Sequence, residues 1–102
     1  MARHRVASVN DVELDTVKGV VAGEQEICLG RCEEGFYAID DVCTHENFLL
    51  SGGEMVEECE VECPQHGSRF NLKTGKVTGL PAVIDARTFA VSVEGSDVYV
   101  DV

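Results

Sequence analysis

The sequence predicts a single all-β domain, and the spacing of its apolar residues is the main reason. Apolar residues alternate with small or polar ones over residues 89–93 and again over 98–102, with the turn residues Gly95-Ser96 between them. Residues 59–63 alternate strictly, which is typical of a half-buried strand, and no stretch keeps a helical period over three turns. We therefore expect antiparallel β-sheets that form a sandwich or barrel over residues 1–102.

The first half of the chain contains four expected strands. Residues 4–9 form the first, and residues 17–21 form the second, which ends at Ala22-Gly23. Residues 26–30 and 36–39 are typical of a hairpin around the turn at residues 33–35. The second strand of this hairpin continues directly into Cys43, so it should deliver that side chain to a loop.

The second half repeats this arrangement. Residues 59–63 form a strand that ends at Cys63, and residues 68–72 turn back at residues 73–76 to form another hairpin with the strand from Val77. Two strands therefore present two loops, which begin at Cys43 and Cys63, at one end of the domain. We expect residues 41–82 to form a subdomain around these loops.

Two half-motifs stand at these loops. Cys43-Thr44-His45 is followed, after seventeen residues, by Cys63-Pro64-Gln65-His66. Two thiolates and two imidazoles can hold zinc, but typical zinc fingers pair Cys with Cys and His with His. A mixed order suits two metals, one bound by both sulfurs and one by both nitrogens, as in a [2Fe–2S] cluster with Cys₂ and His₂ ligation. Zinc stays the alternative.

These residues also carry a resemblance to a known family. Cys-Thr-His followed by Cys-Pro-Gln-His-Gly-Ser-Arg-Phe resembles the cluster-binding signature of Rieske proteins. The whole chain resembles the small ferredoxins of bacterial aromatic-ring-hydroxylating dioxygenase systems. The resemblance implies a Rieske fold and one [2Fe–2S] cluster, with Cys43 and Cys63 on the inner iron and His45 and His66 on the outer, redox-active iron.

The resemblance also concerns the surroundings of the cluster. Respiratory Rieske proteins join their two loops by a disulfide, at positions that are Phe48 and Gln65 here. They also carry a Ser and a Tyr that hydrogen-bond the cluster and its ligands; this chain has Ser68 but Phe70. Pro81 lies in a segment similar to the loop that covers the cluster. These differences imply a reduction potential near the low end of the Rieske range, about −150 to +300 mV.

The implied function is that of a soluble one-electron carrier rather than an enzyme. It would take electrons from a flavin-containing NAD(P)H reductase and pass them to a terminal Rieske oxygenase. An oxygenase would need its own 2-His-1-carboxylate iron site, for which only His4 is left. The small subunit of an NAD(P)H nitrite reductase and a zinc-stabilised interaction module are the alternatives.

Composition limits the partners and the location. Nineteen acidic against eight basic residues give a formal net charge of −11, so nucleic acid would be repelled. No apolar run is long enough to span a membrane, and the N-terminal residues lack the apolar core of a secretory signal. We therefore expect a cytoplasmic protein with no membrane contact.

Three cysteines lie outside the two half-motifs. Cys28 and Cys32 are about 13 Å apart in an extended chain, too far for a disulfide between them, and we expect both to be small buried side chains. An odd total of five cysteines argues against a complete disulfide framework. Cys59 should face inward without a ligand role. Phe48 and Leu49 should form a small core beneath the first loop, with an exposed docking patch as the alternative.

Overall fold

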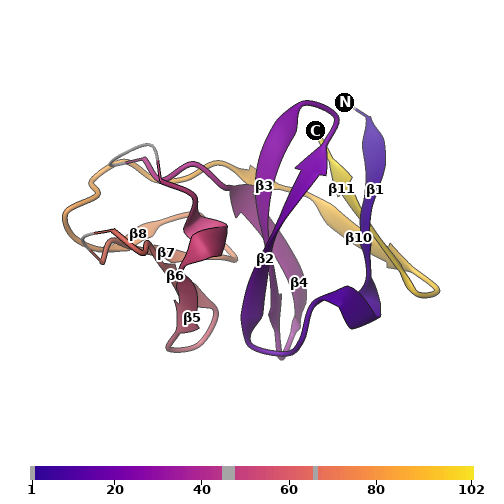
Figure 1. Cartoon of the computed structure of the whole chain (residues 1–102), viewed down its shortest axis with the longest axis horizontal. Helices are drawn as coiled ribbons and strands as arrows, with labels where there is room; N and C mark the ends of the chain where they lie inside the picture. Colours follow the sequence, from indigo (N-terminus) through magenta and orange to yellow (C-terminus); the bar gives the residue numbers. More distant parts are fainter. Residues whose placement is uncertain (1, 45–47, 66) are drawn as a thin grey trace.

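The computed structural model describes residues 2–44, 48–65 and 67–102, and in these residues the strands form three antiparallel sheets. The strand orders are β1–β11–β10, β2–β3–β4–β9 and β5–β6–β7–β8 (Figure 1). This confirms the predicted all-β class. The strands are β1 Arg3–Ser8, β2 Thr16–Ala22, β3 Gln25–Cys32, β4 Gly35–Asp40, β5 Glu54–Val56, β6 Glu60–Glu62, β7 Arg69–Asn71, β8 Val77–Gly79, β9 Thr88–Phe89, β10 Val91–Glu94 and β11 Asp97–Asp101.

Helical structure in the described part of the chain is limited to two 3-10 turns, η1 (Val9–Asp11) and η2 (Leu50–Gly52). None of the helices described is long and apolar enough to cross a membrane. The predicted absence of a long helical period is therefore matched by the structure of these residues.

The β2–β3–β4–β9 sheet separates two hydrophobic cores. On one face, Ile27 and Leu29 of β3 pack with residues of the β1–β11–β10 sheet. On the other face, Cys28 and Cys32 pack with residues of the β5–β8 sheet. Because successive side chains of a strand point to opposite faces, β3 is buried almost continuously.

The β5–β8 sheet forms one end of the molecule, at the left of Figure 1, and the chain termini lie close together at the top of the view, away from this sheet. The termini are held together by two backbone hydrogen bonds, from Ala2 N to Val102 O and from Val102 N to Ala2 O. The last β5–β8 strand returns through a long connection to β9. In the chain, the β5–β8 sheet is thus inserted between β4 and β9, two neighbouring strands of the middle sheet.

The predicted strands are confirmed, with one difference in the last stretch. Residues 89–93 were expected to form one strand, but Phe89 pairs with Ala38 of β4 whereas Val91 pairs with Val100 of β11. The chain passes from one sheet to the next at Ala90. The alternating pattern of residues 89–93 is therefore shared between two strands in different sheets, because both sheets bury the same face of this segment.

The cysteine prediction was wrong for Cys32. Cys32, at the end of β3, forms a disulfide with Cys59, just before β6, and their Cα atoms are 5.6 Å apart. Local spacing gave no signal for this bond, because packing of two sheets brings together residues separated by 27 positions. A loop of this length corresponds to a stabilisation of about 3–4 kcal/mol through the entropy of the unfolded chain. Cys28 is buried as expected, and so is Cys59.

Candidate metal centre

The first cysteine loop follows β4 and is closed by the backbone. Cys43 N donates to Phe48 O at 2.8 Å, and Val42 and Leu49 form an isolated antiparallel bridge beside it. Cys43 is buried at the base of this loop. The predicted ligand His45 lies outside the described residues.

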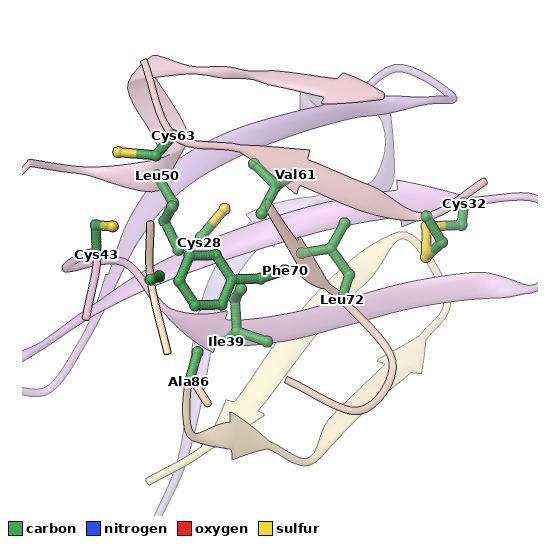
Figure 2. Close-up of a cluster of buried hydrophobic side chains, with 12 residues drawn as sticks. Cys28, Cys32, Ile39, Cys43, Leu50, Val61, Cys63, Phe70, Leu72 and Ala86 are labelled. Atoms are coloured by element: carbon green, nitrogen blue, oxygen red, sulfur yellow. A yellow bond between two sulfur atoms is a disulfide. The ribbon is translucent and has the colours of Figure 1, made fainter. Parts of the chain in front are cut away.

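The second cysteine loop follows β6 and is closed in the same way. Cys63 N donates to Ser68 O at 2.7 Å, so in each loop the cysteine N–H meets the carbonyl five residues further on. Cys63 is buried, and Figure 2 shows Cys43 and Cys63 at the same end of the shared core. His66, the other predicted imidazole ligand, lies outside the residues that the structure describes. The structure thus brings two buried thiols together at the bases of two matching loops.

A buried carboxylate, Asp41, fixes the start of the first loop. Both of its oxygens accept hydrogen bonds from Ser51, one from the backbone N and one from Oγ, each at 2.7 Å. Its backbone carbonyl accepts a further bond from Leu50 N. This role of Asp41 was not predicted from the sequence. The signal that could have found it was a lone acid between an apolar strand and Cys43, followed ten residues later by a Ser beside a Gly pair.

The two loops approach each other at Gly53. A Cβ at this position would lie 1.9 Å from the carbonyl oxygen of Glu62 and 3.2 Å from Cδ of Pro64. A distance of 1.9 Å to a backbone atom is far inside van der Waals contact, so only glycine fits here. Gly53 therefore lets the segment after the first loop pack against the residues on both sides of Cys63.

The segment that contains Pro81 is bound to both cysteine loops. Ala82 N donates to the buried Oγ of Ser68 at 3.1 Å, and Thr44 Oγ1 donates to Ile84 O at 2.6 Å. Pro81 itself is partly buried and follows a cis peptide bond. These contacts hold the segment against the two loops, which is where the sequence analysis expected a covering loop.

Phe70 and Cys28 line the core between the loops and the disulfide. Phe70 is fully buried on β7, and its ring extends toward the end of the core where Cys43 lies (Figure 2). Burial, together with the nearby Asp41 carboxylate, raises the pKa of the Cys28 thiol well above its usual value. Cys28 therefore stays a protonated thiol and behaves as an apolar core side chain.

The expectation that Phe48 and Leu49 form a small core was wrong. Their side chains are 41% and 44% exposed, and Leu50, the next residue, is the buried one. The backbone of Phe48 and Leu49 closes the first loop, and the side chain of Leu50 takes the place in the core. Further exposed apolar side chains lie in the segment that contains Pro81. We call this set the apolar collar: Phe48, Leu49, Leu80, Val83 and Ile84.

Residues 2–90 match the Rieske [2Fe-2S] domain family, and the chain therefore belongs to that family. Its cofactor is accordingly a Rieske-type [2Fe–2S] cluster. The donor set at the site fits this cofactor, because two buried thiols at matching loops can supply the sulfur ligands of one iron.

Curated relatives and solved structures give the same grouping. The chain is 48% identical over 66 residues to the 3-phenylpropionate/cinnamic acid dioxygenase ferredoxin subunit of Shigella boydii, a match over 65% of this chain and 62% of that protein. The matched segment is thus less than two thirds of the relative's length. The ferredoxin of carbazole 1,9a-dioxygenase from Nocardioides aromaticivorans has a similar structure, with a TM-score of 0.92, 31% identity and coverage of 98% of this chain and 97% of that one.

A third similar structure comes from a complex of oxygenase and ferredoxin in carbazole 1,9a-dioxygenase. The matched chain has a TM-score of 0.88 and 32% identity, over 96% of this chain and 91% of that one. The small subunit of a putative NADPH nitrite reductase shares the fold with a TM-score of 0.84, but at only 19% identity. The latter likeness shows the fold alone.

Proposed function

We propose that this chain is the ferredoxin component of an aromatic-ring-hydroxylating dioxygenase system. It carries single electrons from a flavin-containing NAD(P)H reductase to a terminal Rieske oxygenase, and it turns over no aromatic substrate itself. The pair of matching cysteine loops carries this proposal, because they occur in a chain that is similar to dioxygenase ferredoxins over nearly its whole length. The likeness to a ferredoxin found in complex with an oxygenase supports the choice of partner.

We assign the cluster ligands to Cys43 and Cys63 on one iron and His45 and His66 on the other. The subdomain that holds these ligands spans residues 41–82. It begins at Asp41, which accepts the hydrogen bonds from Ser51, and ends at Ala82, which donates a hydrogen bond to Ser68. When bound, the cluster accepts and returns one electron. The chain's own residues fix the two cysteines: each loop is closed by a backbone hydrogen bond, and Asp41 and Gly53 set the distance between the loops.

Ser68 and Phe70 tune the potential in this proposal. The oxygen of the Ser68 hydroxyl accepts a hydrogen bond from Ala82 N, so the hydroxyl proton can be donated to a different acceptor, for which we propose a sulfur atom of the bound cluster. Phe70 contributes an apolar ring and no hydroxyl donor. Hydrogen bonds to cluster sulfur favour the reduced form of the cluster. A chain with the Ser68 hydroxyl alone, and no Tyr hydroxyl, should therefore have a reduction potential in the low part of the Rieske range.

The apolar collar is the proposed contact surface for the terminal oxygenase. Its members lie in the first loop and in the segment bound to both loops, so they lie next to the loops that would hold the cluster. Leu80 is 76% exposed, and exposed apolar side chains that lie together as in this collar mark interaction sites, whereas single ones do not. The net charge of −11 would steer the carrier toward basic surfaces on both redox partners. Because NAD(P)H is the source of the electrons, we place the carrier in the cytoplasm.

Reconstitution tests the proposal. The holoprotein is mixed with a flavin reductase and a terminal oxygenase of this class, and NADH oxidation is measured together with oxygen uptake in the presence of aromatic substrate. We expect turnover only when all three components are present, and lower rates at high salt. A Leu80→Ser/Ile84→Ser variant should keep its cluster but raise the concentration needed for half-maximal turnover. Turnover that is equally fast without this chain would contradict the proposal.

A further inference from the structure

The Cys32–Cys59 disulfide lies at the end of the β5–β8 sheet remote from the cysteine loops. Cys59 precedes β6 and Cys63 follows it, and Figure 2 shows the disulfide and the two loop cysteines at opposite ends of the core. The disulfide joins the end of β3 to the start of β6, so it links the middle sheet directly to the β5–β8 sheet. None of the proposed cluster chemistry uses it.

The disulfide faces a surface pocket. Cys32 and Cys59 both line a pocket of about 250 Å³, together with Leu14 and Met55. Both cysteines are otherwise buried. Attack on a disulfide requires access of a thiolate to a sulfur atom, and the pocket that both cysteines line offers the route for a small thiol that we infer.

The walls of the pocket are acidic. The sequence places two glutamates after the first cysteine, in Cys32-Glu33-Glu34, and two before the second, in Glu57-Glu58-Cys59. Disulfide formation brings both pairs to one pocket, where they join Asp15. Lys73 offsets part of this charge, since its Nζ binds the Glu34 carboxylate at the rim. The remaining field repels an approaching thiolate and repels most strongly a thiol with additional negative charge.

We propose that Cys32 and Cys59 form a thiol–disulfide exchange site that selects its reductant by charge, reacting fastest with cationic thiols and slowest with anionic ones, and that its state sets the stability of the β5–β8 sheet. A thiolate attacks one sulfur, the S–S bond breaks, and the other cysteine leaves as a thiolate that takes up a proton. A second thiol then attacks the mixed disulfide and releases the cysteine that was attacked first. Two electrons and two protons reach the protein, and two thiols become one disulfide.

This selectivity has a consequence for the fate of the bond. Glutathione carries a net negative charge, so it belongs to the slow class at this pocket. The bond would persist in the presence of glutathione and would open to a thiol whose reacting end is cationic. Opening it removes a covalent link between two sheets at one end of β6, while the two cysteine loops at the other end keep their backbone hydrogen bonds.

A series of matched small thiols tests the charge selectivity. Cysteamine, 2-mercaptoethanol and 2-mercaptoethanesulfonate share one carbon skeleton and differ in the charge of the terminal group. The anaerobic holoprotein is incubated with each, quenched in acid and digested, and the loss of the linked peptide that contains Cys32 and Cys59 is followed by mass spectrometry. After correction for thiolate fraction, we expect rates to fall about fivefold for each added negative charge at low salt. In about 0.5 M KCl the three rates should converge.

Two charge variants sharpen this test. Glu57→Gln/Glu58→Gln should reduce the spread of the three rates, whereas Glu24→Gln/Glu26→Gln, which removes the same charge at the opposite end of β3, should leave the spread unchanged. Equal rates for the three thiols in the unaltered protein would overturn the proposal. The proposal would also be overturned if the folded protein contained no linked Cys32–Cys59 peptide before thiol was added. It would be overturned as well if none of the three thiols reduced this disulfide.

The effect on stability is measured separately. Thermal loss of the visible cluster absorbance is compared among the oxidised protein, the thiol-reduced protein and a Cys32→Ser/Cys59→Ser variant, with Cys28→Ala as the control that removes a buried cysteine outside the disulfide. We expect the reduced protein and the double variant to share a lower midpoint. Treating the double variant with thiol reveals any direct attack on the cluster. A midpoint that does not change on reduction would overturn the second half of the proposal.

Discussion

The two ends of β6 carry cysteines with opposite roles. Cys59 and Cys63 lie on either side of β6, four residues apart, and both are buried in the same core as Val61. Cys59 meets Cys32 across the interface between two sheets and forms a disulfide. Cys63 opens a loop closed by Ser68, beside Cys43. The strand gives both cysteines the same burial; what packs opposite each one decides whether it becomes a structural bond or a proposed iron ligand.

Exchanging each cysteine for serine tests this contrast and gives the largest expected effects. Cys63→Ser should lose nearly all bound iron and visible absorbance, because a serine is a poor substitute for a cluster thiolate. Cys59→Ser should keep the cluster at 25 °C but lose about 3–4 kcal/mol of stability, which lowers Tm by roughly 10–20 °C. Iron analysis and thermal melts check both results. Loss of iron from Cys59→Ser, or full iron in Cys63→Ser, would contradict the contrast.

Gly53 sharpens the comparison at the ligand end of β6. Gly53→Ala would place a methyl group 1.9 Å from the Glu62 carbonyl oxygen and push the two loops apart. We expect a loss of roughly 3 kcal/mol, at the upper end for overpacking, and weaker cluster retention during urea unfolding. Gly52→Ala is the matched control, because its Cβ would meet only Pro64 Cγ at 3.8 Å. Equal stability of the two variants would show that the loops tolerate separation.

Asp41 tests the first loop in the same way. Asp41→Ala leaves the backbone N and Oγ of Ser51 without their acceptor in a buried position, at an expected cost of about 2–3 kcal/mol. The neighbouring Asp40→Ala removes a more exposed carboxylate that pairs with Arg87, and it should cost about 1 kcal/mol or less. Chemical unfolding of both variants measures the difference. A larger loss for Asp40→Ala would mean that Asp41 does not fix the loop.

Phe70 lies in the core between the cysteine loops and the disulfide. Its replacement by tyrosine is expected to change the reduction potential of the cluster rather than the fold. Phe70→Tyr adds a hydroxyl to a buried ring that extends toward Cys43. A hydrogen bond that favours the reduced form by about 1 kcal/mol raises a one-electron potential by about 40 mV. Protein-film voltammetry measures the shift, and Phe89→Tyr, on a ring outside this core, is the control. No shift in Phe70→Tyr would mean that its hydroxyl reaches no acceptor at the cluster.

The smallest expected effect is at the disulfide end, where Glu34 pairs with Lys73. The hydrogen bond from Lys73 lowers the pKa of Glu34 from its usual value. A lowered folded-state pKa contributes stability that is present above the unfolded pKa and is lost as pH falls through the folded one. Glu34→Gln should therefore lower Tm slightly at neutral pH and not at all in acid. A Tm difference that grows as the pH falls would contradict this sign.

The sequence predicted the parts of the fold that depend on local pattern. Alternation located the strands around Cys43 and Cys63, and the mixed order of Cys and His pointed to the class of cofactor. The ligand set itself stays a prediction, since His45 and His66 lie outside the described residues. Residues 89–93 show the limit of alternation, because it marks which face is buried and not which sheet buries it.

What the sequence did not predict depends on contacts between distant segments. Cys32 meets Cys59, and Asp41 binds Ser51, only after separate strands and turns have packed together. The prediction for Phe48 and Leu49 was wrong for a related reason. An apolar pair next to a buried strand is typical of a core, but here the backbone of the pair closes a loop and Leu50 is the buried residue. Composition and spacing do not indicate whether such an apolar side chain is buried in the core or lies exposed on a loop.

We propose above all that two cysteines and two histidines hold one [2Fe–2S] cluster at the end of β6 remote from the disulfide. Pulsed EPR of the dithionite-reduced holoprotein tests it most directly, because unpaired spin on the histidine-ligated iron couples to imidazole nitrogen. We predict couplings from two nitrogen ligands, of which one disappears in either His45→Cys or His66→Cys while Cys59→Ser leaves both unchanged. A reduced cluster without nitrogen coupling, or a colourless protein that holds zinc and no sulfide, would contradict the account.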